Sequence, residues 1–567
     1  MSTEKRIAEW LGPPFDKETQ KAVALLSENP KEAEEAFYTS LQFGTGGMRG
    51  IMGVGTNRIN KYTLGKSTQG LSRFLKNKYK GEQLCVVVAF DCRNQSQSLA
   101  KTVADVFTAN GIYCYLFREL RPTPQLSFMV RHLKAHCGIV LTASHNPPKY
   151  NGYKVYGKDG GQLVPPDDQS IIKEIEQTSF QEILFEGNSN LLEYLEETTD
   201  IPYQNTVLQE ATMHALDRSQ LKIVFTPIHG TSITAIPQVL EKAGYQKLYI
   251  VKEQEQPNGN FPTVKSPNPE EEDALKMAVN LAQSKNADIV IGTDPDADRL
   301  GIVIKDSNQE WYYLNGNQIM VVLTEYLLSK KQAEKKLTQQ HFIASTIVST
   351  PMIQKVAAAY KVQYKKCLTG FKWIAKLIQD HPELKFVGGG EESYGFLVGT
   401  QVRDKDAVSA SLLICELASE LQCKGMSIFS YLMECYKKYG IFYERLHSLT
   451  KEGKEGAQEI KAMMSQFRTH PPKSIASIPV KSISDYLYST TTELSNASIN
   501  QIDLPKADVL LFHLEDGSEI ALRPSGTEPK IKFYFSVQGG FQEQLPWQKQ
   551  QKVLNHKIDL FIKELIH

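Results

Sequence analysis

The fold is organised around residues 138–148, whose sequence is Gly138-Ile139-Val140-Leu141-Thr142-Ala143-Ser144-His145-Asn146-Pro147-Pro148. The apolar residues at its start predict a buried strand, and its two prolines prevent continuation as a helix or a central strand. We therefore expect Ser144 on a rigid loop at a strand end, with small neighbours that leave its hydroxyl accessible. Because ordinary turn chemistry explains the same residue types, a role for Ser144 depends on other segments.

Strand-like and helical segments alternate through most of the chain. Residues 84–90 predict a buried strand, residues 98–110 a helix and residues 112–117 a second strand. This order implies parallel pairing through a helical crossover, which is typical of α/β proteins. Residues 1–43 carry helical spacing, and residues 151–156 are expected to continue the loop after Ser144.

The C-terminal part has a different pattern. Residues 508–514 and 520–522 predict strands joined by a turn at Asp516-Gly517, and residues 547–566 predict a helix. We expect an α/β protein with three α/β domains that have mixed sheets and a C-terminal α+β domain. The predicted bounds are 1–205, 206–314, 315–440 and 441–567.

Composition limits the class of partner. The 567 residues include 64 basic and 64 acidic side chains, so no net positive field favours nucleic acid, and we expect no nucleic-acid partner. No apolar stretch approaches the length of a membrane span or a secretory signal, so we expect neither a membrane partner nor secretion. The eight cysteines contain no CxxC pair, which indicates reduced thiols and a cytoplasmic protein.

The strongest chemical pattern is Asp294-Pro295-Asp296-Ala297-Asp298, which follows an apolar run. Three carboxylates at this spacing can converge on one hard cation, Mg²⁺ or Ca²⁺. A calcium-binding EF-hand begins in the same way, but Arg299 stands where that loop needs glycine and Lys305 where it needs glutamate. A solvated acidic turn is the alternative.

Five further segments carry polar groups suited to a phosphorylated sugar. Arg523-Pro524-Ser525-Gly526-Thr527 combines a guanidinium, hydroxyls and a glycine, as a phosphate cradle needs. Glu391 and Ser393 lie beside glycines and suit sugar hydroxyls. Arg49 in a glycine-rich loop, Lys154 near Ser144, and Lys372 after Gly370 supply cations. Taken singly, each loop is also explained as a connector.

Together, in this order, these loops resemble the α-D-phosphohexomutases. The matching segments are Thr142 to Pro147 for the phosphoserine loop, Asp294 to Arg299 for the metal loop, Gly390 to Ser393 for the sugar loop and Arg523 to Pro529 for the phosphate loop. The resemblance implies the four-domain phosphohexomutase fold and a phosphoserine at Ser144. It also implies Mg²⁺ bound by Ser144, Asp294, Asp296 and Asp298, and substrate binding by Arg299, Glu391, Ser393, Arg523, Ser525, Gly526 and Thr527.

The implied reaction interconverts sugar phosphates through a bisphosphate that turns over in the site. Arg49, His145, Lys154 and Lys372 are the candidates for proton transfer, with no ranking among them. Glu391-Glu392-Ser393-Tyr394-Gly395 resembles the bacillus-type phosphoglucomutase and phosphopentomutase branch. Glucose 1-phosphate and glucose 6-phosphate are the favoured substrates, with glucose 1,6-bisphosphate as intermediate and activator. Mannose phosphates, pentose phosphates, a sugar-bisphosphate synthase and a non-catalytic phosphosugar-binding protein are the alternatives.

Overall fold

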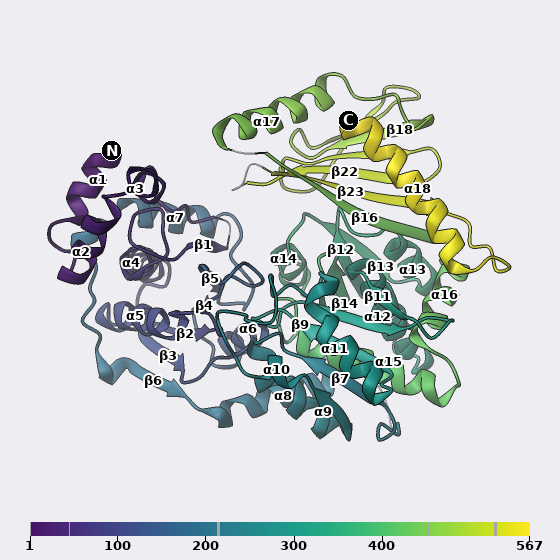
Figure 1. The fold of residues 1–567 in the computed structure, drawn as a ribbon, viewed down its shortest axis with the longest axis horizontal. Coiled ribbons are helices and arrows are strands. Elements are labelled where there is room, and N and C mark those ends of the chain that lie inside the picture. Colours follow the sequence, from purple (N-terminus) through teal and green to yellow (C-terminus); the bar gives the residue numbers. More distant parts are fainter. Residues whose placement is uncertain (1, 45, 213–215, 452, 527–529, 567) are drawn as a thin grey trace. The chain divides into compact units, whose positions relative to one another are not determined.

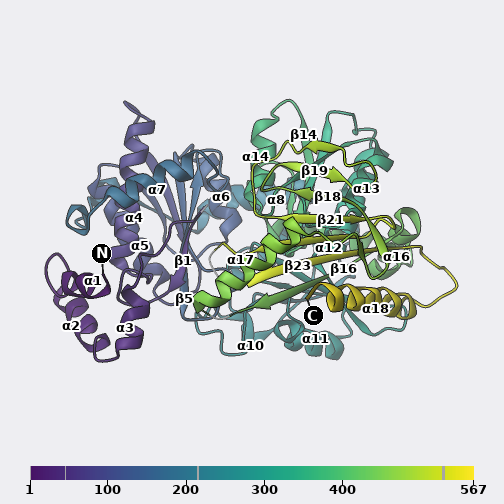
Figure 2. The ribbon, with the colours of Figure 1, turned by 90° about the horizontal axis from the view of Figure 1, so that it is seen from above.

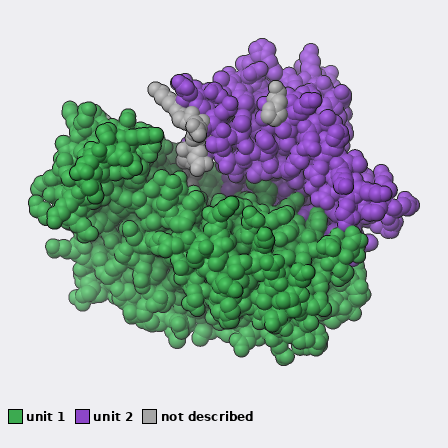
Figure 3. All heavy atoms as spheres, in the orientation of Figure 1, with its two compact units in different colours: residues 1–316, 371–428 green, residues 317–370, 429–567 purple. Residues whose placement is uncertain are grey.

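The structure is a computed structural model that describes residues 2–44, 46–212, 216–451, 453–526 and 530–566 (Figure 1). The chain divides into two compact units, residues 1–316 with 371–428 and residues 317–370 with 429–567 (Figure 3). No helix within the described ranges is both long and apolar enough to cross a membrane. All eight cysteines are free thiols, as expected.

The first unit begins with three short helices, α1 (Thr3–Trp10), α2 (Lys17–Leu26) and α3 (Pro30–Phe37). Ser2, Asp16 and Asn29 cap them by accepting backbone N–H bonds. Trp10 is fully buried and its ring stacks on Phe15 at 4.3 Å between centroids. This aromatic cluster fixes the N-terminal helices onto the first sheet domain, because Tyr62 of the following helix belongs to it.

A six-stranded mixed sheet follows in the order β1-β5-β4-β2-β3-β6. Its strands are β1 (Gly47–Ile51), β2 (Cys85–Phe90), β3 (Tyr113–Phe117), β4 (Cys137–Leu141), β5 (Tyr150–Gly157) and β6 (Leu192–Leu195). The helices of this part are α4 (Lys61–Lys78), α5 (Ser96–Ala109), α6 (Thr123–His132), α7 (Asp167–Gln177) and α8 (Asp200–Ala211), with short 3₁₀ turns at Phe180–Glu182, Ser189–Leu191 and Glu197–Thr199. The predicted parallel pairing of β2 with β3 is confirmed.

The expectation that residues 151–156 continue a loop is wrong. They belong to β5, which pairs antiparallel with both β4 and β1. Tyr153 and Val155 alternate into the core, and a side chain at Gly152 would lie 2.4 Å from the Thr142 carbonyl oxygen. The prolines therefore shape a tight connection between two strands, and the absence of a side chain at Gly152 allows β5 to lie against the Ser144 loop.

A second, five-stranded mixed sheet has the order β11-β10-β9-β7-β8. Its strands are β7 (Lys222–Thr226), β8 (Lys247–Ile250), β9 (Ile289–Thr293), β10 (Leu300–Lys305) and β11 (Trp311–Leu314). Its helices are α9 (Ile236–Ala243), α10 (Lys252–Glu255) and α11 (Glu272–Lys285), and a 3₁₀ turn covers Thr231–Thr234. The carboxylate-rich segment 294–298 connects β9 to its antiparallel neighbour β10. The remaining elements of this unit are α14 (Lys372–Asp380), the antiparallel pair β14 (Lys385–Glu391) and β15 (Gly395–Val398), and α15 (Ala407–Cys423).

The second unit contains α12 (Gly316–Ala333), the parallel pair β12 (His341–Thr346) and β13 (Gln363–Cys367), α13 (Met352–Tyr360) and α16 (Ile428–Tyr439). Its antiparallel sheet comprises β16 (Ile441–Thr450), β17 (Ser474–Ile475), β18 (Ile478–Asp485), β19 (Thr490–Glu493), β20 (Ile499–Gln501), β21 (Leu510–Leu514), β22 (Glu519–Pro524) and β23 (Lys530–Gly539). Helices α17 (Gly453–Thr469) and α18 (Trp547–Ile566) lie along this sheet (Figure 2). The predicted C-terminal helix is confirmed, as is the turn at Gly517, whose φ is 83°.

Candidate active site

Ser144 is the third residue after Leu141, where β4 ends. Its backbone φ is 52°, in the left-handed region that non-glycine residues seldom adopt, and the Thr142 hydroxyl holds this turn by accepting the Ser144 N–H at 2.8 Å. The Ser144 hydroxyl donates to Asp294 Oδ2 at 2.6 Å, and only 3% of the residue is exposed. The predicted accessible hydroxyl is therefore wrong: Ser144 is directed at a buried carboxylate.

Arg93 binds the backbone of the Ser144 loop. Its guanidinium donates to the carbonyl oxygens of Ser144 at 2.5 Å and of Pro147 and Tyr150 at 3.0 Å. Both Arg93 and its ion-pair partner Asp91 are buried. Arg93 was not predicted to be a site residue. Its position in the sequence could have indicated it, because Arg93 follows β2, and β2 runs parallel to β4 and ends at the same edge of the sheet.

The three aspartates of segment 294–298 converge on one point. One carboxylate oxygen from each lies within 4.8 Å of the others, and the exposed fractions of Asp294, Asp296 and Asp298 are 0%, 0% and 2%. Ala297 at φ 57° turns the backbone. Asp294 Oδ1 accepts the N–H groups of Asp298 at 3.1 Å and Arg299 at 3.0 Å, which fixes the curvature of the loop. The solvated acidic turn is thereby excluded.

This cluster has the donor set of a divalent cation site. Asp296 Oδ1 and Asp298 Oδ1 are buried and have no hydrogen-bond partner among the residues that the structure describes. An unpartnered buried carboxylate oxygen is costly, and carboxylate oxygens are the ligands that Mg²⁺ and Ca²⁺ take. The residues present therefore fit a hard divalent ion, with the Ser144 hydroxyl on Asp294 as its neighbour.

Two lysines partly neutralise the aspartates. Lys154 from β5 donates to Asp296 Oδ2 at 2.6 Å and to Asp298 Oδ2 at 3.0 Å, and Lys405 lies 3.1 Å from the same Asp298 oxygen. Burial and the two neighbouring carboxylates raise the pKa of Asp294 well above its ordinary value. Burial also acts to raise the pKa of Asp298, but Lys154 and Lys405 outweigh it and hold that pKa below its ordinary value.

Lys405 was not predicted from the sequence. It lies in the run Arg403-Asp404-Lys405-Asp406 directly before α15, and all four residues are buried. Lys405 Nζ is 3.4 Å from Asp404 and 3.9 Å from Glu391. Tyr156 of β5 donates to Asp404 at 2.7 Å, so this run links the first sheet to the aspartate cluster. Four consecutive charges between a strand and an apolar helix are the sequence signal that could have found it.

Comparisons with known proteins identify the family of the chain. Family models described as phosphoglucomutase/phosphomannomutase α/β/α domains I, II and III match residues 40–182, 202–308 and 315–439. A phosphoglucomutase of Staphylococcus aureus (strain MRSA252) is 39% identical over 516 residues, covering 89% of this chain and 91% of that protein. One of Staphylococcus epidermidis (strain ATCC 12228 / FDA PCI 1200) is 38% identical over 518 residues, covering 90% and 93%.

The chain belongs to the α-D-phosphohexomutase family. It is an enzyme of the phosphoglucomutase type with three α/β/α domains that have mixed sheets and a C-terminal antiparallel sheet domain. A solved phosphoglucomutase/phosphomannomutase family protein from Burkholderia thailandensis has the same fold, with a TM-score of 0.66 and 17% identity over 92% of this chain and 97% of that one.

The segment 390–395, predicted to bind the sugar, lies beside the candidate metal loop 294–299. Leu300 N donates to the Tyr394 carbonyl oxygen at 2.9 Å, and Glu391 is buried next to Lys405. Burial raises the pKa of Glu391 to about 7, although Lys405 acts in the opposite direction. Arg299 pairs with Glu270. Ser393 occupies the turn between β14 and β15.

The candidates for proton transfer lie at different places. His145 Nδ1 is 3.2 Å from the Ser144 hydroxyl, and burial, with Arg299 and Arg49 adding to it, lowers the pKa of His145 well below its ordinary value. Arg49 is exposed on β1 and donates to Asn146 Oδ1 at 2.7 Å, so it reaches the Ser144 loop. Lys154 contacts the aspartates directly.

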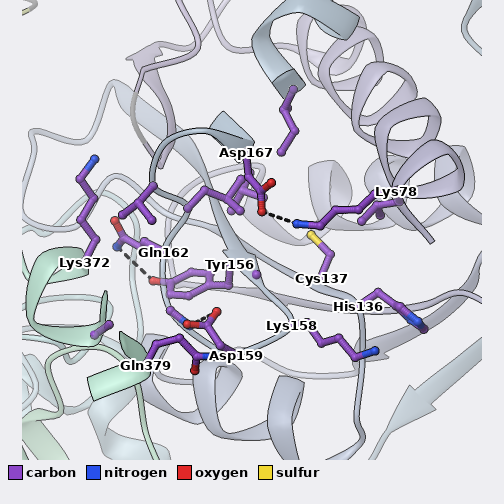
Figure 4. Close-up of a pocket in the computed structure, with 18 of the residues that line it drawn as sticks. Lys78, His136, Cys137, Tyr156, Lys158, Asp159, Gln162, Asp167, Lys372 and Gln379 are labelled. Carbon is purple, nitrogen blue, oxygen red and sulfur yellow. Dashed lines mark hydrogen bonds and ion pairs between the residues drawn. The ribbon is translucent and has the colours of Figure 1, made fainter. Parts of the chain in front are cut away.

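Lys372, at the start of α14, lines another pocket of about 500 Å³ (Figure 4). Gln162 and Tyr156, joined by a hydrogen bond of 3.3 Å, form part of its wall. Neither Ser144 nor the three aspartates line it. The phosphate loop belongs to the second unit: Arg523 lies in β22, Ser525 N donates to the Lys530 carbonyl oxygen at 2.7 Å, and Gly526 follows. Thr527 lies outside the described residues.

Proposed function

We propose that this phosphohexomutase interconverts glucose 1-phosphate and glucose 6-phosphate, with Ser144 as the carrier of the phosphoryl group. The two Staphylococcus relatives are phosphoglucomutases, which supports glucose over mannose or pentose phosphates. The observation that carries the proposal is the hydrogen bond from Ser144 to Asp294, which directs the hydroxyl at the aspartate cluster. The proposed domain bounds remain 1–205, 206–314, 315–440 and 441–567, and we propose a cytoplasmic location.

Asp294, Asp296 and Asp298, together with a phosphate oxygen on Ser144, would bind Mg²⁺. Bound there, the ion would neutralise charge on the phosphoryl group during transfer. Phosphoserine passes its group to one end of the sugar phosphate and so forms glucose 1,6-bisphosphate. The bisphosphate then turns over, and its other phosphate returns to Ser144. Lys154 is a candidate for proton transfer as a donor to the departing oxygen, because its ammonium already carries a proton and contacts two aspartates.

The remaining assigned residues position the substrate. Glu391 is proposed to accept hydrogen bonds from sugar hydroxyls, and Ser393 to donate hydrogen bonds to them. Arg299 is proposed to balance charge beside these two residues. Arg523, Ser525, Gly526 and Thr527 are proposed to hold the phosphate that is not reacting, because a guanidinium and free N–H groups suit a phosphate in either orientation of the sugar. His145, Arg49 and Lys372 are further candidates for proton transfer or phosphate binding.

The test compares Ser144→Ala with the control Ser98→Ala. Ser98 is exposed and donates only to the Gln95 carbonyl oxygen, so its loss should leave turnover unchanged. Ser144→Ala should abolish interconversion of the glucose phosphates, and mass spectrometry should find phosphoserine only in the wild type and the control after incubation with glucose 1,6-bisphosphate. Wild-type turnover by Ser144→Ala would refute the mechanism. Faster turnover of mannose or ribose phosphates would refute the choice of glucose.

A further inference from the structure

A pocket of about 570 Å³ lies between the N-terminal helices and the first sheet domain. Arg6 of α1, the segment 39–43, helices α4 and α7, and Phe180 line it. We call it the extension pocket. None of the residues assigned above to the aspartate cluster, the sugar loop or the phosphate loop lines it, and it has no part in the proposed reaction.

One wall of the extension pocket is formed by the N-terminal segment. The family match to domain I begins at residue 40, so the preceding helices are additional to the matched domain. They are firmly attached: Trp10 is fully buried, and Tyr62 Oη of α4 accepts the Asp16 N–H at 2.7 Å. Arg6 donates to the carbonyl oxygens of Phe37 at 2.8 Å and Tyr38 at 2.5 Å. The extension is therefore a fixed wall of the pocket.

The pocket contains a half-buried lysine without an anionic partner. Within the described part of the chain, no carboxylate lies within ion-pair distance of the Lys66 ammonium and no acceptor hydrogen-bonds to it; its contact is the Phe180 ring, 5.4 Å away. Burial lowers the pKa of Lys66, although Glu9 and Glu176 act in the opposite direction. A desolvated ammonium gains free energy when an anion reaches it.

The remaining lining mixes apolar and polar groups. Leu41, Phe43, Met48, Ile172 and Ile175 contribute hydrocarbon surface, whereas Arg6 adds a second cation and Glu176 a carboxylate. A cavity that combines apolar side chains with a few charged groups can bind a small amphipathic molecule. We propose that the extension pocket binds a small amphipathic anion, with an apolar body against these side chains and a single carboxylate or sulfonate group on Lys66.

Occupancy of this pocket reaches the active site through Met48 and β1. Phe43 and Met48 both line the pocket, and Met48 lies on β1. Arg49 follows Met48 on β1 and bonds to Asn146 of the Ser144 loop. A ligand that displaces Met48 therefore shifts Arg49 and changes turnover. This coupling rests on the proposed mutase function, whereas binding itself does not.

Binding is tested on the full chain with the fluorescent probe 8-anilinonaphthalene-1-sulfonate. Lys66→Met, which keeps the length of the side chain and removes its charge, should weaken binding of the probe at least tenfold. Lys66→Arg should stay within about threefold of the wild type. Lys76→Met, an exposed lysine on the same helix, is the matched control and should change nothing. Equal affinity of Lys66→Met and the wild type would overturn the proposal.

Competition experiments with octanoate and 1-octanol distinguish the contribution of the anionic group from that of apolar contact. Turnover measurements then distinguish binding in the pocket from an effect on the active site. Octanoate should displace the probe, and 1-octanol should do so at least tenfold less well; equal displacement would refute a role for Lys66. Saturating octanoate should change glucose 1-phosphate turnover in the wild type but not in Lys66→Met, and binding without any change would refute the coupling. Ser144→Ala should bind the probe normally while losing turnover, so failure of the mutase proposal stays distinguishable from failure of this one.

Discussion

Replacing Lys405 with methionine tests how the aspartate cluster is balanced. Lys405 is buried, and its ammonium lies 3.1 Å from Asp298, 3.4 Å from Asp404 and 3.9 Å from Glu391. Methionine has a similar length and packs in the same space, so the change removes a charge and leaves little cavity. Asp298 then keeps only Lys154 as a cation within ion-pair distance among the described residues.

The expected loss follows from these contacts. At an effective dielectric constant of about 20, one pair at this distance is worth about 5 kcal/mol before desolvation is counted. Removing one partner of a buried ion pair costs about 3–5 kcal/mol, because the remaining charge is left uncompensated. Glu391 relieves part of this cost: its pKa, already raised to about 7 by burial, rises further without Lys405, and the carboxyl becomes neutral at pH 7. We therefore expect a loss of about 3 kcal/mol.

The assay is urea unfolding of the wild type and variant, with EDTA and with saturating Mg²⁺. Lys405 and a bound cation neutralise the same carboxylates, so Mg²⁺ should recover part of the loss in Lys405→Met; at 100 times the dissociation constant, binding stabilises by about 2.7 kcal/mol. Lys376→Met is the control, since this lysine forms a solvent-exposed pair with Asp380 on α14 that is worth at most about 1 kcal/mol. Equal unfolding midpoints of Lys405→Met and the wild type in EDTA would refute the reasoning.

Three further outcomes are expected. Arg523→Ala should weaken substrate binding by roughly 2–4 kcal/mol through lost phosphate contacts, and unchanged KM and kcat would count against the phosphate cradle. Burial raises the pKa of Glu210 from 4.5 to about 7, so the folded chain keeps a proton that the unfolded chain loses. Stability should fall by about 3 kcal/mol as pH rises from 4.5 to 7, and Glu210→Gln should remove this slope in denaturant titrations. Gly152→Ala should lower both the melting temperature and turnover, because the added carbon would lie 2.4 Å from the Thr142 carbonyl oxygen; unchanged melting would contradict that contact.

Strong hydrophobic patterns made much of the fold predictable. The runs at 84–90 and 138–141 are buried strands because their residues face helices on both sides of the first sheet. The hydrophobic pattern did not predict strands whose residues are exposed and whose structure depends on backbone pairing instead of burial. Strands β19 and β20 consist mostly of polar residues, all partly or fully exposed, such as Thr490–Glu493, and are held by backbone pairing with neighbouring strands. The helix α17 also went unpredicted.

The candidate site also contains residues that the sequence could predict and residues that it could not. Ligands that lie close together in sequence, such as the three aspartates, were predictable because a metal needs several of them on one loop. The groups that neutralise those ligands come from distant segments: Lys154 from β5 and Lys405 from the start of α15. A lone lysine in a sequence is most often solvated, and nothing local distinguishes a buried one. The fold decides which lysine meets a carboxylate.

The same reasoning explains why one prediction about Ser144 was correct and another was wrong. Its loop was predicted correctly, but its burial was not, because exposure depends on the loop 294–298 that covers it. The Ser144 hydroxyl donates to a buried carboxylate at 2.6 Å, so any group carried on Ser144 would lie beside the aspartates. Phosphate on Ser144 would add negative charge beside three carboxylates, where Lys154 and Lys405 are the lysines within ion-pair distance among the described residues. This charge balance, and the Asp296 and Asp298 oxygens that lack a hydrogen-bond partner within the described ranges, are consistent with a divalent cation at the cluster.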